Sequence, residues 1–255
     1  MCQVPITLLT PFNGDLLELR NNINKNINEL ALNDKWIVVF DNITFDWGNL
    51  VSDERVIFLA YGGECGAGNA RNFGLKYIEN NMTYPFLLLP IDADDFLVSG
   101  SLEMIKKSMC GKKDNMVSFG HIKNWPNRRL TISYDGFYTV EDLLKRYVTP
   151  CGSTILRITE KSIFNEIQFS RRKRANDNLF FLQAAKYFGG FRCCPSPVLV
   201  YNVGNPNSLS GKKYKQIFYK YLALRDFGLS RFHAIYLLGF YIITGVKRYI
   251  FKQSL

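Results

Sequence analysis

The chain has 255 residues, 47% hydrophobic and 15% aromatic, so it is long and apolar enough to bury the core of an α/β domain. This composition excludes a disordered or low-complexity protein. The formal net charge is +10, and residues 212–255 carry nine Lys/Arg against one acid, or +8, which leaves +2 for the rest of the chain. A nearly neutral body is therefore followed by a basic tail.

The first hundred residues alternate short apolar runs with helical patterns. A helix is expected from Asp15 to about Leu30, another from 69 to about 80 after a glycine-rich loop, and a third beginning at Ser101. The apolar runs that read as buried strands lie at 6–10, 36–40, 56–59 and 86–89. This alternation predicts a parallel sheet with helices on both faces.

The second half is more mixed, which predicts a mixed, mainly parallel sheet overall. Helices are expected over 139–148 and from about 176, and strands near 116–119, 130–134, 153–158 and 197–203.

Polar residues follow several of these strands. Thr10, Asp41 and the run Asp92-Ala93-Asp94-Asp95 all lie at expected strand carboxyl ends. Ligands of such sheets bind beyond these ends, so the residues should meet in one crevice.

The cluster of carboxylates suggests a divalent cation. Like charges this close repel, whereas oxygen ligands suit Mg²⁺ or Mn²⁺, which can bridge to the phosphates of a nucleotide. The pattern alone leaves a solvated acidic turn as the alternative. The chain has no GxGxxG after its first strand and no GK[ST], so neither of those phosphate-binding loops is expected.

Cysteine and histidine usage bears on the compartment. The six cysteines form no CxxC and the chain has only two histidines, which argues against a zinc site and favours a reducing cytosol. The first residues have no basic stretch ahead of the apolar one, so no signal peptide is expected.

Six motifs together resemble the inverting glycosyltransferase family 2, of the bacterial polysaccharide and lipopolysaccharide type. They span about residues 4–211 in the order of that family: "LLTPFN", "VVFDN", "GAGNARNFGL", "LLPIDADDF", "ANDNLFFLQAAKY" and "CPSPVLVYNVGNPNSLS". The resemblance implies a GT-A fold over 1–211, with a nucleotide-binding half (1–100) and an acceptor half (101–211), and leaves 212–255 as a helical tail.

The resemblance also implies roles for individual residues. Asp177 would be the catalytic base, although Asn176 stands where the family commonly has Glu. Asp94, with Asp92, would bind Mn²⁺ or Mg²⁺. The nucleotide sugar would be bound by Thr10, Pro11, Phe12, Asn13, Asp41, Arg71, Asp92, Ala93 and Asp94. Arg171, Arg172, Arg174 and Trp125 are candidates for contacts to the acceptor or to phosphate, with a solvated surface as the alternative.

The chemistry suits these residue types. Inverting transfer is an in-line displacement in which a carboxylate takes the proton of the acceptor hydroxyl. The expected reaction moves a hexose or N-acetylhexosamine, from UDP by family habit, to a lipid-linked, lipopolysaccharide or capsule glycan. A sugar nucleotidyltransferase is the enzymatic alternative, but such enzymes have a glycine-rich loop where this chain has Pro11-Phe12-Asn13-Gly14.

The basic tail has three interpretations. Its last helix has an apolar middle, 234–246, of 13 residues, short of the roughly 20 needed to cross a bilayer. Basic residues flank this stretch, which favours attachment to an anionic membrane, at the inner face of the cell membrane. Packing on the catalytic domain and a homodimer through the apolar face are the alternatives. Binding to nucleic acid is the competing function of another class, and the contiguous apolar residues argue against it.

Overall fold

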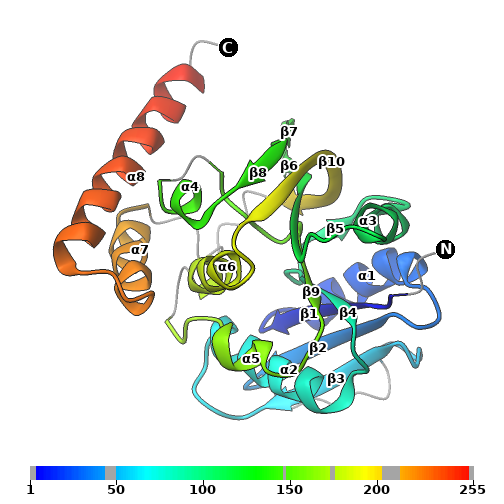
Figure 1. The fold of residues 1–255 in the computed structure, drawn as a ribbon. Coiled ribbons are helices and arrows are strands. Elements are labelled where there is room, and N and C mark those ends of the chain that lie inside the picture. Colours follow the sequence, from blue (N-terminus) through cyan, green and yellow to red (C-terminus); the bar gives the residue numbers. More distant parts are fainter. Residues whose placement is uncertain (1–3, 44–49, 146–147, 173–175, 203–212, 253–255) are drawn as a thin grey trace.

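The structure, a computed structural model, describes residues 4–43, 50–145, 148–172, 176–202 and 213–252, without the side chains of 213–216 and 244–252 (Figure 1). Its strands are β1 (Ile6–Phe12), β2 (Lys35–Asp41), β3 (Val56–Tyr61), β4 (Phe86–Pro90), β5 (Phe96–Leu97), β6 (Met116–Trp125), β7 (Arg128–Ile132), β8 (Gly136–Tyr138), β9 (Thr154–Ile158) and β10 (Phe191–Asn202). Its helices are α1 (Leu16–Asn26), the 3₁₀ turn η1 (Ile27–Glu29), α2 (Ala67–Asn81), α3 (Ser101–Met109), α4 (Val140–Leu144), α5 (Ile163–Glu166), α6 (Asn176–Tyr187), α7 (Lys213–Asp226) and α8 (Arg231–Lys252).

The strands form one mixed sheet in the order β3-β2-β1-β4-β9-β6-β10-β5, with β7 on β6 and β8 on β10. β1 pairs in parallel with β2 and with β4, and β2 does so with β3. β9 is antiparallel to β4 and β6, while β10 is parallel to β6. Because β3, β2, β1, β4, β6 and β10 run in one direction, the predicted α/β class with a mainly parallel sheet is confirmed.

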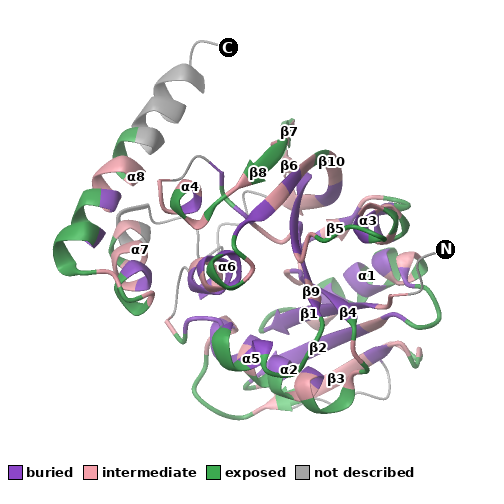
Figure 2. Ribbon diagram, in the orientation of Figure 1, coloured by how far each residue is buried: buried purple, intermediate pink, exposed green. Residues whose placement is uncertain are grey.

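Both faces of the sheet are covered, which explains the unbroken apolar runs of its central strands. Leu8 and Trp36 face α1 and α3 in one core cluster. Their neighbours Leu9 and Ile37 face the other cluster, to which α2 and α4–α8 contribute. Figure 2 shows the central strands buried between these two layers.

Some elements differ from the sequence-based expectation. The helix expected over 139–148 is α4 alone: a capping box between Thr139 and Asp142 begins it, and it ends at Leu144. Residues 146–147 lie outside the described part of the chain. The elements β5, β8 and α5 were not predicted, because two to four residues are too few to show a hydrophobic period.

The helical tail expected after residue 211 forms two helices, α7 and α8, and they pack on the body. Leu224 of α7 and Ala234 and Leu237 of α8 are buried in the same core cluster as α6. Figure 1 shows α7 beside α6 and α8 beside α7, on the side of the molecule away from α1 and α3. No helix within the described residues is long and apolar enough to cross a membrane.

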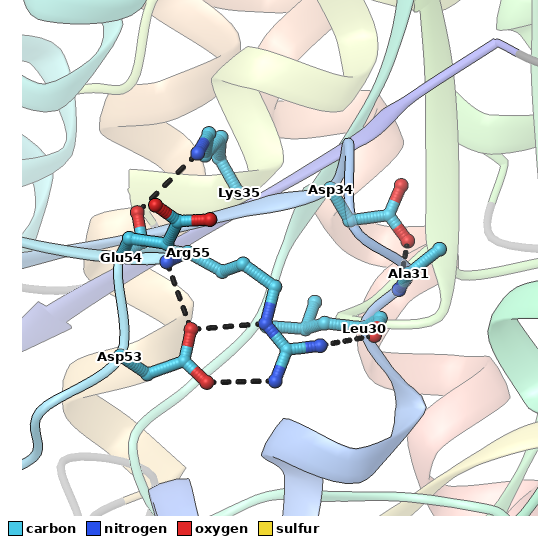
Figure 3. Close-up of polar contacts among 7 residues, drawn as sticks. All are labelled: Leu30, Ala31, Asp34, Lys35, Asp53, Glu54 and Arg55. Atoms are coloured by element: carbon cyan, nitrogen blue, oxygen red, sulfur yellow. Dashed lines mark hydrogen bonds and ion pairs between the residues drawn. The ribbon is translucent and has the colours of Figure 1, made fainter.

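The amino-terminal ends of β1, β2 and β3 are held by paired charges (Figure 3). Asp34, fully buried, accepts hydrogen bonds from the backbone N–H of Ile6 and of Ala31, both at 2.8 Å, and forms an ion pair with Lys106. Arg55 binds Asp53 through two nitrogens, at 2.9 and 2.7 Å, and also donates to the carbonyl of Leu30. The Arg55 hydrogen bond lowers the pKa of Asp53 to about 2. This edge of the sheet therefore satisfies its own charges.

Candidate functional site

Arg71 joins three segments at the carboxyl edge of the sheet. Its side chain, 8% exposed, forms an ion pair with Asp92, in the segment after β4. It also donates to Oδ1 of Asn176, at the start of α6, at 3.0 Å. The Cζ atom of Arg71 lies 5.2 Å from the centroid of the Phe169 ring. Three motifs far apart in the sequence, on α2, after β4 and on α6, thus meet at one guanidinium.

This meeting depends on close packing between α2 and the start of α6. A Cβ added at Gly68 would lie 2.0 Å from the carbonyl oxygen of Ser170 and 3.1 Å from Cβ of Asn176. Only glycine fits there without moving the backbone. Gly68, the second glycine of the "GAGNAR" stretch, therefore lets the helix of Arg71 approach the helix of Asp177.

Asp177, predicted as the base, lies in the first turn of α6 and is partly exposed. Burial raises the pKa of its carboxyl, the positive charge of Arg71 acts in the opposite direction, and Asp92 raises it further. Asn178 donates to Oδ1 of Asp177 at 3.3 Å, and Lys220 of α7 donates to the side chain of Asn178. The adjacent Asn176 accepts a hydrogen bond from Arg71 and is uncharged, whereas a Glu at this position would add a negative charge.

The other carboxylates of the Asp92–Asp95 segment lack the compensation that Asp92 has. Asp95 is 1% exposed, and neither of its oxygens has a hydrogen-bond partner among the described residues. Burial, with the charges of Asp92 and Asp94, raises its pKa well above the usual range. Burial and Asp92 also raise the pKa of Asp94. Isolated buried carboxylates are costly, and a divalent cation is the ligand that would offset the cost.

The residues present therefore fit a divalent cation by their chemistry. Across the described residues, no three His, Cys, Asp or Glu side chains are arranged as a ready-made metal cluster. Asp94 and its neighbours can supply part of a coordination shell, and phosphate oxygens and water commonly complete it for Mg²⁺.

Three asparagines hold this acidic segment by its backbone. Asn202, at the end of β10, donates to the carbonyl of Asp94 at 2.5 Å. Asn22 and Asn26 of α1 donate to the carbonyl of Asp95 at 2.8 and 3.2 Å. The amides of α1 and of β10 thus hold the backbone of the segment from two sides and do not bind its carboxylates.

Tyr201, next to Asn202, was not predicted from the sequence. Its pKa is raised by burial and by Asp92, Asp95, Asp177 and Asp94, so its hydroxyl lies within the field of all four carboxylates. Both Tyr201 and Asn202 belong to a stretch that the family resemblance covered. Their position at the end of a strand was the available signal.

A hollow of about 510 Å³ opens beside Asp94. The residues that line it come mainly from α1: Asp15, Leu17, Glu18, Asn21, Asn22 and Lys25, with Asp94, Phe96 and Asn202. Lys25 lies 4.4 Å from the centroid of the Phe96 ring. Amides, carboxylates and one ring face are groups that bind hydroxyl-rich ligands.

The predicted nucleotide contacts from β1 and β2 divide into buried and accessible groups. Thr10 is fully buried, and its Oγ1 accepts from Nε1 of Trp36 at 2.9 Å. Pro11 and Phe12 are also buried, so these three positions offer little or no accessible surface to a ligand. Asn13 is exposed, with its Nδ2 3.7 Å from Sγ of Cys65. Ala93 is partly exposed and packs on a core cluster.

Asp41 connects the end of β2 to the glycine-rich loop before α2. It is 3% exposed, and its Oδ2 accepts from the backbone N–H of Gly66 at 2.8 Å and from Sγ of Cys65 at 3.4 Å. This brings Asn13, Asp41 and Cys65 together. Cys65 is exposed and was not predicted as a site residue.

The acceptor candidates are dispersed. Arg172 binds both carboxylate oxygens of Asp226 in α7, at 2.7 and 2.8 Å, and Arg171 is exposed. Trp125 lies partly exposed at the end of β6. Arg174 lies outside the described residues. Arg172 is therefore engaged in holding α7 to the segment before α6.

Comparisons with solved structures show which fold this is. No family model matches the chain, and no curated protein matches its sequence. Residues 1–349 of TarS from S. aureus, in complex with UDP-GlcNAc, match with a TM-score of 0.62 at 16% identity, over 92% of this chain and 70% of that one. The mannosyltransferase PcManGT from Pyrobaculum calidifontis, in complex with GDP-Man and Mn²⁺, matches with a TM-score of 0.59 at 15% identity, over 92% and 68%. The predicted GT-A-like fold is confirmed.

Proposed function

We propose that the chain is a metal-dependent, inverting glycosyltransferase of family 2. It would move a hexose or N-acetylhexosamine from a nucleotide sugar, with UDP as the nucleotide, to a hydroxyl of a glycan acceptor. The observation that carries this proposal is the meeting of Arg71 with Asp92 and Asn176, beside Asp177 and near Asp94 and Asp95, two carboxylates whose pKa burial raises. The shared fold with chains that bind UDP-GlcNAc and GDP-Man supports it.

Asp177 is the proposed base. In an in-line displacement, the acceptor hydroxyl attacks the anomeric carbon, the bond to the diphosphate breaks, and the hydroxyl proton passes to the Asp177 carboxylate. Burial gives this carboxylate a pKa above its usual value, which makes it a stronger base, while Arg71 limits the shift and keeps it ionised. The start of α6 favours the ionised form as well.

Asp94 and Asp92, with Asp95 behind them, are the proposed holders of Mn²⁺ or Mg²⁺. The cation would supply positive charge for the leaving diphosphate. The asparagine contacts to the backbone of Asp94 and Asp95 orient these carboxylates before any ligand binds. Because Arg71 pairs with Asp92, Asp94 would bring the larger uncompensated charge to the cation, and Asp92 would be shared between the cation and Arg71.

The nucleoside is proposed to lie over the ends of β1 and β2. Asn13 and Asp41 are the proposed side-chain contacts at this edge, and the buried residues Thr10, Pro11 and Phe12 would support it from below. Ala93, between the two metal carboxylates, would lie under the ribose or sugar. The acceptor is proposed to be a lipid-linked, lipopolysaccharide or capsule glycan, met at the cytoplasmic face of the cell membrane.

A donor screen tests the proposal. Hydrolysis and thermal protection are measured for UDP-, GDP- and dTDP-sugars, each with Mn²⁺ and with chelator. We expect one donor class to be hydrolysed and to raise Tm only with the metal. If no nucleotide sugar protects the protein or is hydrolysed in Mn²⁺, the proposal is wrong.

A further inference from the structure

The side of α8 that faces solvent is unusually apolar. Phe232, Ile235, Tyr236, Ile242 and Ile243 are exposed by 87%, 58%, 59%, 43% and 55%. Phe232 lies three and four residues before Ile235 and Tyr236, and these two lie seven before Ile242 and Ile243, so the five residues share one face of the helix. Contiguous exposed apolar surface marks a site of interaction. We name these five residues the outer face of α8.

The opposite side of α8 is already engaged. Ala234 and Leu237 are buried in the core cluster that contains Leu224 of α7 and the residues of α6. In Figure 2, exposed stretches of α8 alternate along the helix with intermediate and short buried ones. Among the described residues, α8 therefore packs on the core through its Ala234 and Leu237 side, and the outer face is a separate surface exposed to solvent.

The charge of the segment selects the partner. Residues 212–255 contain nine Lys/Arg and a single acid, Asp226. Both oxygens of that acid are bound by Arg172, so its charge is neutralised from the body. A second copy of the chain would bring the same positive charge to the contact, which is repulsive. An anionic surface that also accepts apolar side chains is complementary on both counts.

We infer that the outer face of α8 binds an anionic lipid bilayer. The five apolar side chains would enter the boundary between headgroups and acyl chains. The Lys/Arg residues of the segment would meet the lipid phosphates, apart from Lys220 and Arg225, which donate within the protein. The inference rests on the proposed function for its purpose, since this surface would place the enzyme where a lipid-linked acceptor is found.

The surface is joined to the proposed base through α7. Arg172 and Asp226 fasten α7 to the segment before α6, and Lys220 donates to Asn178, which donates to Asp177. The outer face and the base helix are therefore parts of one packed unit. A bilayer held on α8 would have a fixed orientation relative to Asp177.

Vesicle co-sedimentation tests the inference. We expect the full chain to bind vesicles of equal parts phosphatidylglycerol and phosphatidylcholine, and to bind pure phosphatidylcholine much more weakly. Added salt should weaken the binding. In the double variant Ile235→Glu/Ile243→Glu, binding should fall by about tenfold or more for each substitution, because each loses the transfer of a whole side chain.

The matched control is Leu32→Glu, which places the same charge at a residue that is 74% exposed and lies far from α8 in sequence. It should leave vesicle binding unchanged. Retained metal-dependent donor hydrolysis in the double variant would show that the surface, and not the nucleotide site, was altered.

Three results would overturn the inference. The first is equal vesicle binding by the double variant and the wild type. The second is a lipid-free dimer, seen by sedimentation velocity, that the double variant converts to a monomer. The third is binding to an oligonucleotide with none to anionic vesicles.

Discussion

The two edges of the parallel half of the sheet differ in whether their carboxylates have hydrogen-bond donors and ion-pair partners within the chain. At the amino edge, Asp34 accepts from two backbone N–H groups and pairs with Lys106. Asp53 is bound by Arg55, as Figure 3 shows. At the carboxyl edge, the charges of Asp92 and Asp94 raise the pKa of Asp95, and the Asn202 backbone and Arg71 offset this only in part. Neither oxygen of Asp95 has a partner at hydrogen-bond geometry among the described residues.

The difference separates charges that hold the fold from charges that await a ligand. A buried carboxylate with all its donors is part of the structure, and its removal should cost stability. One without donors is a cost to the free protein, and its presence is explained by a partner from outside. Substitution at the two edges should therefore have effects of opposite sign on stability.

The largest expected effect is on catalysis, from Asp177→Asn. The amide keeps the shape but cannot take a proton, so we expect kcat to fall by about 10²–10⁴-fold. In the wild type, kcat/KM should decline on the acid side with a pKa above the ordinary 3.8 of aspartate, because burial raises the pKa of Asp177. Steady-state rates over a range of pH measure both.

Donor binding is the control for that variant. Asp177→Asn should bind the nucleotide sugar as the wild type does, since the base acts on the acceptor. Turnover near that of the wild type would show that Asp177 is not the base, and the other carboxylates of the site would become the candidates for that role.

The next effect in size is the loss of stability in Asp34→Asn. The amide loses the charge that binds Lys106 and turns a donor toward a backbone N–H, so we expect the free energy of unfolding to fall by about 3 kcal/mol. Urea unfolding measures it. Asp53→Asn is the matched variant at the same edge; its partner Arg55 is 22% exposed, so the loss should be smaller. If Asp34→Asn left the free energy of unfolding unchanged, the proposed difference between the two edges would be wrong.

The smallest effect is a gain, in Asp95→Asn without metal. Because the folded state raises the pKa of Asp95, the native wild type binds its proton more tightly than the unfolded chain does. Wild-type stability therefore falls as pH rises from the usual value of about 3.8 through the raised one. At neutral pH the variant should be more stable by about 1 kcal/mol or more, and near pH 4 the two should converge.

Urea unfolding in chelator at the two pH values measures this difference. Asp95→Asn less stable than the wild type at pH 7 would mean that the carboxylate already has a structural partner, as Asp34 does.

Much of the fold was readable from the sequence, because its central strands are buried on both faces and appear as apolar runs between helical patterns. Asp41, Arg71, Asp92 and Asp177 lie at the ends of elements that those patterns delimit. The resemblance identified the same residues. The structure then showed that Arg71, Asp92 and Asn176 meet.

The supports of the site could not be predicted in this way. Asn22 and Asn202 hold the acidic segment across 73 and 108 residues of chain, and no local pattern marks a contact so distant in sequence. The buried side chain of Thr10 was hidden for the same reason, since its partner Trp36 lies on the neighbouring strand. The packing of α8 was obscured because its buried and exposed faces are both apolar.

The central claim is that the unpaired carboxylates at the carboxyl edge hold a divalent ion that binds the donor's diphosphate. The most direct measurement is calorimetric titration of UDP into the wild type and Asp94→Asn, each with Mn²⁺ and with chelator. We predict that the wild type binds UDP tightly only with Mn²⁺, and that Asp94→Asn loses this dependence together with the affinity. Equal UDP binding by the wild type in chelator and in Mn²⁺ would contradict the account.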